Sequence, residues 1–127
     1  MPIAALYAAI LTPLFIGLAV RVVLRRNSLA TTIGDGGDAA LTRRIRVHGN
    51  FCEYAPMALL LLALAESVAT PGWVLHLAGI LLVAGRCLHA FGVSQLNETL
   101  GFRIVGMALT FASIIVAALA CLAGALA

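Results

Sequence analysis

The chain has 127 residues, of which 63% are hydrophobic and only 10% are charged, and its mean hydropathy is +1.11. Soluble domains are about half apolar and about a quarter charged, so this composition excludes an ordinary soluble domain and predicts a membrane protein. The net charge of +3 comes from arginine alone, because the chain has no lysine. These arginines cluster near the ends of apolar runs and form no basic surface interleaved with aromatic residues, which argues against nucleic acid as a partner.

The apolar runs predict one all-α domain over residues 1–127, an integral membrane bundle of four helices. The expected spans cover about residues 3–25, 43–66, 73–93 and 101–125, each close to the ~20 residues that cross a bilayer. The first run is too long for the core of a signal peptide, so we expect it to stay in the mature protein. Pro13 and Pro56 lie inside the first two spans and should bend them.

The segments between the spans carry the turn-forming residues. Residues 27–41 combine glycines with aspartates and form the expected first loop. Either Asp38 or Thr42 can cap the second helix, and Asn97 or Thr99 can cap the fourth. Pro71 is well placed near the first turn of the third helix, where a missing backbone donor costs nothing.

Three cysteines lie at wide spacings inside the apolar runs: Cys52, Cys87 and Cys121. An odd number at such spacings suits neither a disulfide framework nor a metal site. We therefore interpret them as small core residues and predict no metal ligand in the chain.

The arginines also predict the orientation in the membrane. They flank the first loop and border the third, whereas both termini and the second loop carry none. By the excess of positive charge in cytoplasmic loops, the first and third loops should face the cytoplasm and both termini the other side. Near the start of the first loop, Arg21, Arg25 and Arg26 can anchor the span at the headgroups or project into a polar site.

A polar stripe runs along the first half of the second span. At 100° per residue, five side chains fall within an arc of roughly 100°, while His48 and Cys52 point elsewhere. Charged groups inside a membrane segment cost at least ~2.5–3.5 kcal/mol each, so they turn toward protein or water and are functional candidates. The stripe consists of Arg43, Arg46, Asn50, Glu53 and Tyr54.

Residues of three spans converge at the same end of the expected bundle. These are Arg46, Asn50, Glu53, Arg86, His89 and Arg103. Arginines outnumber the single acid expected to be buried there, which predicts an anionic ligand carrying carboxylates or a thiolate. The chain has no nucleophilic triad and no glycine-rich phosphate loop, so a nucleophile would arrive with the ligand.

The pattern Arg43-x-x-Arg46-x-His48-x-Asn50-x-x-Glu53-Tyr54-x-Pro56 resembles the second-helix signature of the MAPEG family, the membrane-associated proteins in eicosanoid and glutathione metabolism. The resemblance extends over nearly the whole chain and includes Arg86-x-x-His89 in the third span. It implies homotrimers of four-helix subunits that bind glutathione between neighbours. The compact form is similar to small bacterial members, which implies the bacterial inner membrane as the location.

The resemblance also implies roles for individual residues. Glutathione, as co-substrate, would contact Arg46, Asn50, Glu53, Tyr54 and Arg86, with Arg26 and His89 as further candidates. Arg103 is similar to the arginine that activates the glutathione thiol. The implied activity is that of a glutathione transferase or peroxidase acting on a hydrophobic small molecule or lipid.

Several alternatives stay open at this point. His89 and Tyr54 can instead be an ordinary core histidine and an anchoring aromatic, and Val93 stands where some relatives have a tyrosine. The whole chain can be a non-catalytic membrane scaffold. It can also be compared with small multidrug transporters of four spans, but these need an acid in the first span, and none lies between Met1 and Leu24.

Overall fold

A computed structural model describes all 127 residues and contains four helices and no strand. The helices are α1 (Pro2–Ser28), α2 (Ala39–Ser67), α3 (Gly72–Ser94) and α4 (Leu100–Leu126). Each is long and apolar enough to cross a membrane. The predicted all-α membrane bundle is therefore confirmed, and the helices extend one to four residues beyond the expected spans because backbone hydrogen bonding continues into their polar ends.

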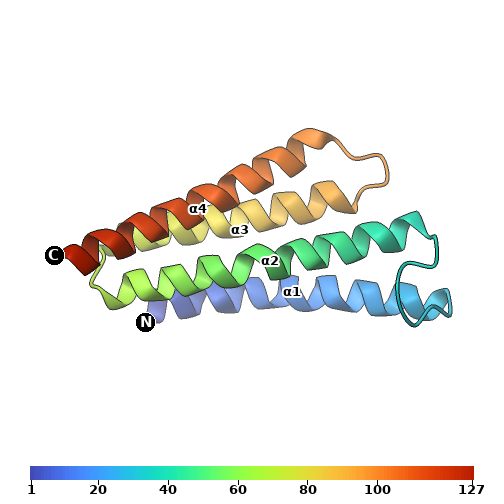
Figure 1. Cartoon of the computed structure of the whole chain (residues 1–127), viewed down its shortest axis with the longest axis horizontal. Helices are drawn as coiled ribbons and strands as arrows, with labels where there is room; N and C mark the ends of the chain where they lie inside the picture. The colour runs from blue at the N-terminus through green and yellow to red at the C-terminus, as the bar shows by residue number, and fades with distance from the viewer.

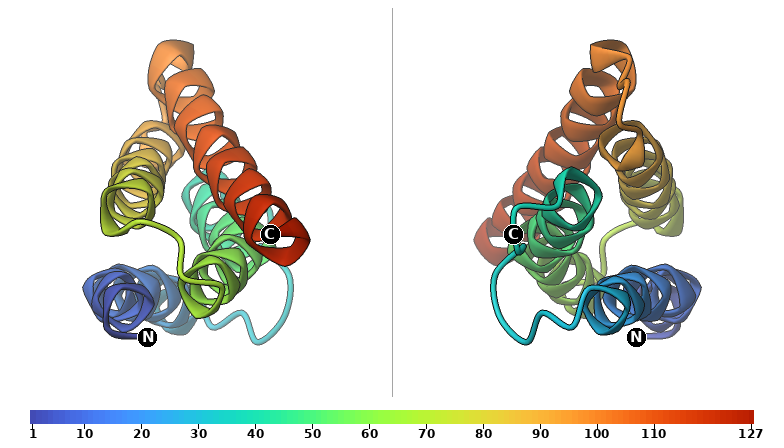
Figure 2. Two further views of the ribbon diagram at one scale, coloured as in Figure 1. Left: turned by 90° about the vertical axis from the view of Figure 1, so that its left-hand side faces the viewer. Right: turned by 90° about the vertical axis from the view of Figure 1, so that its right-hand side faces the viewer.

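The four helices run antiparallel to their chain neighbours, so both termini lie at the end that also holds the α2–α3 turn (Figure 1). The α1–α2 and α3–α4 loops lie together at the opposite end, which we call the arginine-rich end because Arg25, Arg43, Arg44, Arg46 and Arg103 lie near it. Helices α1 and α4 do not touch, whereas α2 contacts all three others. The two views of Figure 2 show that α4 diverges from α2 toward the arginine-rich end.

Small residues let α3 and α4 approach closely. A Cβ atom added to Gly85 would lie 2.8 Å from the carbonyl oxygen of Gly106, and one added to Gly106 would lie 2.6 Å from the backbone nitrogen of His89. Any side chain at these two glycines would therefore push the helices apart. Their contact brings the middle of α4 against Arg86 of α3, which positions the site described below.

The first loop is held by an aspartate at the start of α2. Asp38 is the N-cap residue, and its carboxylate accepts a hydrogen bond of 2.8 Å from the backbone nitrogen of Leu41. The same carboxylate binds Arg25 at the end of α1, with the closest N···O distance 2.7 Å. Asp38, and not Thr42, therefore caps α2, and it ties the end of α1 to the start of α2. Thr99 is the N-cap of α4 but makes no side-chain capping bond.

One expectation about single residues was wrong. Cys52 and Cys87 are exposed on the outer surface of the single chain, and only Cys121 is partly buried, so the cysteines are not uniformly core residues. Pro13 and Pro56 lie inside α1 and α2, as expected, and both helices continue past them. The missing donor of each proline falls within a long helix whose remaining backbone bonds and neighbours hold it together.

Candidate ligand site at the arginine-rich end

Arg86 is the centre of the polar site and is almost fully buried, with 2% of its surface exposed. Its Nε and Nη2 atoms donate hydrogen bonds of 3.0 and 2.8 Å to the Thr110 hydroxyl of α4. Its Nη1 atom donates a bond of 2.6 Å to Asn50 Oδ1 of α2. No carboxylate forms an ion pair with it. Because an arginine keeps its charge, the interior of the bundle contains a positive charge balanced only by dipoles.

Aromatic groups close this site on the side of α2 and α4. The Arg86 guanidinium carbon lies 5.9 Å from the centre of the Tyr54 ring, within the range of a cation–π contact. The Tyr54 ring packs edge-on against Phe111 of α4, with 5.6 Å between the ring centres. The structure thus brings three predicted site residues together: Arg86, Asn50 and Tyr54.

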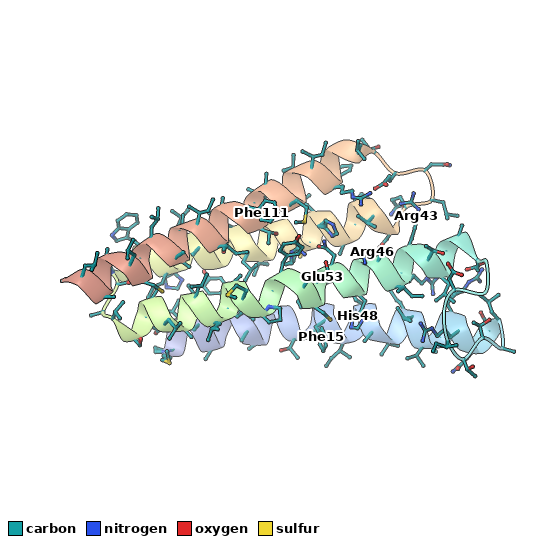
Figure 3. All side chains as sticks on the ribbon, in the orientation of Figure 1. Phe15, Arg43, Arg46, His48, Glu53 and Phe111 are labelled. Atoms are coloured by element: carbon teal, nitrogen blue, oxygen red, sulfur yellow. The ribbon has the colours of Figure 1, made fainter.

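Arg46 and Glu53 lie on the same side of α2 and form a loose ion pair of 3.7 Å (Figure 3). Their side chains are 61% and 52% exposed in the single chain. The expectation that Glu53 is buried among arginines is therefore wrong for one subunit, because the carboxylate points outward from α2 and does not reach Arg86. Glu53 nevertheless lies at the middle of the helix Ala39–Ser67, where lipid would be a poor environment for a carboxylate.

A second acid was missed by the charge count from the sequence. Glu98 lies in the α3–α4 loop, and its Oε1 atom is 3.2 Å from Arg43 Nη1 and 3.3 Å from Arg103 Nη1. Arg43 also donates a bond of 3.1 Å to the backbone carbonyl of Val93. Arg103, the expected thiol-activating residue, is therefore partly neutralised in this structure, although half of its side chain is exposed.

Two hollows flank Arg46 at the arginine-rich end. One, of about 370 Å³, is lined by Arg43, Arg46, Glu98 and Arg103. The other, of about 330 Å³, is lined by Arg26, Asp35 and Arg46. Arg26 and Arg103 thus line different hollows, which have Arg46 in common.

The first loop adds a fixed negative charge to the second hollow. Hydrogen bonds from the Gly37 backbone nitrogen and the Thr42 hydroxyl hold the pKa of Asp35 below its usual value. The pKa of Asp38 is also lowered, first by the hydrogen bond from Arg25 and then by the one from Leu41. Both aspartates therefore stay ionised at neutral pH, and Asp38 removes Arg25 from the set of arginines open to a ligand.

The opposite face of α2 is separate from this site, as the stripe predicted. His48 packs against Phe15 of α1, with 5.4 Å between the ring centres, and its Nε2 atom is 3.6 Å from Cys52 Sγ. In Figure 3 both His48 and Phe15 lie on the α1 side of α2, away from Glu53 and Phe111. His89 of α3 is buried, with 4% of its surface exposed, so one subunit does not present it to a ligand.

Thr110 is the site residue that sequence analysis overlooked most clearly. A threonine in an apolar helix usually bonds to its own backbone, and Thr110 does donate to the carbonyl oxygen of Gly106. Its oxygen also accepts both bonds from Arg86, which nothing in the spacing of α4 indicates. Glu98 had a weak signal, because it is the acid nearest to Arg103 in the sequence.

These features define an integral membrane protein of four helices, with a positively charged polar site at one end of the bundle. The sequence model of the MAPEG family matches residues 2–123. The chain is also 34% identical over 118 residues to the inner membrane protein YecN of Escherichia coli K12, which covers 93% of this chain and 88% of that protein. YecN of E. coli strain O6:H1 matches to the same extent. The chain belongs to the MAPEG family.

Proposed function

We propose that this protein binds glutathione at the arginine-rich end of a homotrimer and transfers it to a hydrophobic electrophile in the membrane. The observation that carries the proposal is the Arg46–Glu53 pair, which is more than half exposed on a membrane-spanning helix of the single chain. Lipid cannot solvate two such groups, so protein or a polar ligand has to cover them. A neighbouring subunit, with glutathione bound between the two subunits, would cover the pair with both protein and a polar ligand.

The charges of the site are complementary to those of glutathione. That tripeptide has two carboxylates, one ammonium group and one thiol. Arg46 is exposed enough to bind a carboxylate, and Arg26 lines the adjoining hollow. Glu53 supplies the acceptor that an ammonium group needs. Arg86, fixed by Asn50 and Thr110, adds a positive potential that favours an anionic ligand.

The arginines also suit the chemistry of thiol transfer. A guanidinium keeps its proton while it stabilises a thiolate, so it lowers the pKa of the bound thiol without acting as a base. The thiolate sulfur then attacks the electrophilic carbon, a C–S bond forms, and the leaving group departs with the electron pair of its bond. Arg103 is the residue assigned to the sulfur, because it is the only charged residue of α4 and lies beside the same hollow as Arg46.

Titration of glutathione into detergent-solubilised protein tests this proposal. The wild type should bind, and Arg46→Gln should bind at least about tenfold more weakly, because one charge-assisted carboxylate contact is lost. Arg44→Gln is the matched control, since Arg44 faces α1 and donates to the carbonyl oxygen of Arg21. The wild type and the control should also conjugate glutathione to 1-chloro-2,4-dinitrobenzene.

Two results would overturn the proposal. If the wild type shows no heat of binding and no conjugation, the polar stripe serves packing alone, as in a scaffold. If Arg44→Gln loses as much affinity as Arg46→Gln, the site responds to net charge and the exposed pair on α2 has no special role. Size-exclusion chromatography with light scattering tests the trimer separately.

A further inference from the structure

A carboxylate of the chain itself already occupies part of the arginine-rich end. Glu98 Oε1 forms ion pairs with two guanidinium groups, at 3.2 Å from Arg43 Nη1 and 3.3 Å from Arg103 Nη1. All three residues line the same hollow of about 370 Å³ as Arg46. Glu98 therefore lies where a carboxylate of an anionic ligand would bind.

The fit of this carboxylate is incomplete. Only 14% of the Glu98 side chain is exposed, and its buried Oε2 atom accepts no hydrogen bond. Guanidinium groups hold a carboxylate best when both of its oxygens accept bonds. An incoming carboxylate that uses both oxygens would form a better complex with the two arginines than Glu98 does. The arginines remain reachable, because the side chains of Arg43 and Arg103 are 28% and 51% exposed.

The position of Glu98 in the chain also allows it to move. It lies in the short loop between Ser94, the last residue of α3, and Leu100, the first of α4. Its carboxylate forms ion pairs only with the two arginines and caps no helix. Rotation of the side chain would therefore free both guanidinium groups without breaking a helical hydrogen bond.

We propose that Glu98 is an internal competitor that occupies Arg43 and the Nη1 atom of Arg103 until a carboxylate of the ligand displaces it, while the other donors of Arg103 remain for the sulfur. The inference rests on the proposed function and adds a subsite to it, with Arg43 as a binding residue. Competition of this kind sets a requirement for the ligand. An anion that lacks a carboxylate at this position has to leave Glu98 in place and binds to the remaining arginines alone.

Glu98→Gln is the variant that tests the competition, because it keeps the shape of the side chain and removes its charge. Two partly exposed ion pairs are lost from the free protein, so the dissociation constant for glutathione should fall by about three- to thirtyfold. Glu66→Gln is the control: it removes the same charge at the opposite end of the bundle, where Glu66 accepts bonds from the backbone nitrogens of Ile3 and Ala4. Its affinity for glutathione should change by less than about threefold.

Blocked ligands show whether a carboxylate is what displaces Glu98. Glutathione monoesters, blocked at one or the other carboxylate, should be titrated into the wild type and Glu98→Gln. The gain in affinity should persist for one monoester and disappear for the other. Equal affinities of Glu98→Gln and wild type for glutathione would overturn the competition. A weaker Glu98→Gln complex would overturn it as well and make Glu98 a positioning residue for Arg103.

A probe other than glutathione separates this inference from the proposed function. Glutarate should protect Arg43 and Arg103 from modification by phenylglyoxal, as measured by peptide mass spectrometry. Protection should require at least about threefold less glutarate in Glu98→Gln than in the wild type. If glutathione binds neither protein but this difference appears, the proposed function fails and the subsite stands. If both proteins need the same glutarate concentration, the subsite itself is wrong.

Discussion

Replacing the buried Arg86 should destabilise the protein less than replacing Asn50, which accepts one of its hydrogen bonds. Arg86 is 2% exposed, and its charge is compensated by the hydrogen bonds that it donates to Asn50 and Thr110, with no carboxylate nearby to pair with it. Asn50→Leu leaves the guanidinium buried with one acceptor fewer. Arg86→Met removes the charge and puts an apolar side chain of similar length in its place. The two variants therefore separate the cost of the charge from the benefit of its bonds.

The structure allows the size of both effects to be estimated. A hydrogen bond to a charged group contributes ~1.5–3 kcal/mol, so Asn50→Leu should destabilise the subunit by about 2–3 kcal/mol. Arg86→Met leaves Asn50 Oδ1 without a donor, at ~1–3 kcal/mol, while Thr110 keeps its bond to the carbonyl oxygen of Gly106. Burial of a charge without a counter-charge costs several kcal/mol, and that cost disappears in Arg86→Met. Arg86→Met should therefore stay within about 1 kcal/mol of the wild type, or be more stable.

Unfolding of detergent-solubilised protein by sodium dodecyl sulfate, followed by circular dichroism, measures these differences. Arg86→Met should unfold at the wild-type detergent fraction or above it, and Asn50→Leu clearly below it. The double variant should be more stable than Asn50→Leu alone, because the charge that had lost its acceptor is gone. Arg86→Met as the least stable of the three would refute the reasoning and show that its bonds outweigh the burial of its charge.

Three further predictions concern separate parts of the chain. Glu53→Gln should keep the unfolding midpoint within experimental error, because the carboxylate is half exposed, and should bind glutathione roughly tenfold more weakly; unchanged affinity would leave the acid without a ligand role. Asp38 has a lowered pKa in the folded protein, so its contribution to stability is complete above pH ~4 and is lost as the pH falls through the lowered value. Asp38→Asn should flatten that loss in an acid unfolding titration, and an unchanged curve would contradict the role of its bond to Arg25. Alkaline phosphatase fused after Ala127 should be active, and an inactive fusion would reverse the orientation expected from the arginines.

The helices of this chain could be predicted because their causes are local. Long apolar runs fix four membrane helices, and glycines with aspartates mark the only long loop. The stripe on α2 could also be predicted, since a period of 100° separates Asn50 and Tyr54 from His48 whatever the neighbours do. Contacts of Asn50 and Tyr54 with Arg86, and of His48 with Phe15, agree with that division.

The remainder of the site depends on contacts between helices that no spacing reveals. Thr110 reaches Arg86 only because Gly85 and Gly106 let α3 and α4 approach closely. Glu98 reaches Arg43 only because the α3–α4 loop folds toward the start of α2. The exposure of Glu53 was mispredicted for a different reason: its position along α2 was read correctly, but its carboxylate is half exposed because the other helices of the chain do not cover it.

The proposed role of the arginine-rich end is to bind glutathione and stabilise its thiolate. The most direct measurement is the ultraviolet absorbance of the thiolate as a function of pH, with glutathione bound to the wild type and to Arg103→Ala. If Arg103 favours thiolate over thiol, the bound sulfur should titrate below free glutathione, and each unit corresponds to ~1.4 kcal/mol of preferential stabilisation. Arg103→Ala should return the midpoint toward that of free glutathione and retain measurable binding. Identical midpoints for bound and free glutathione in the wild type would contradict the proposed role, and identical midpoints in the two proteins would remove Arg103 from it.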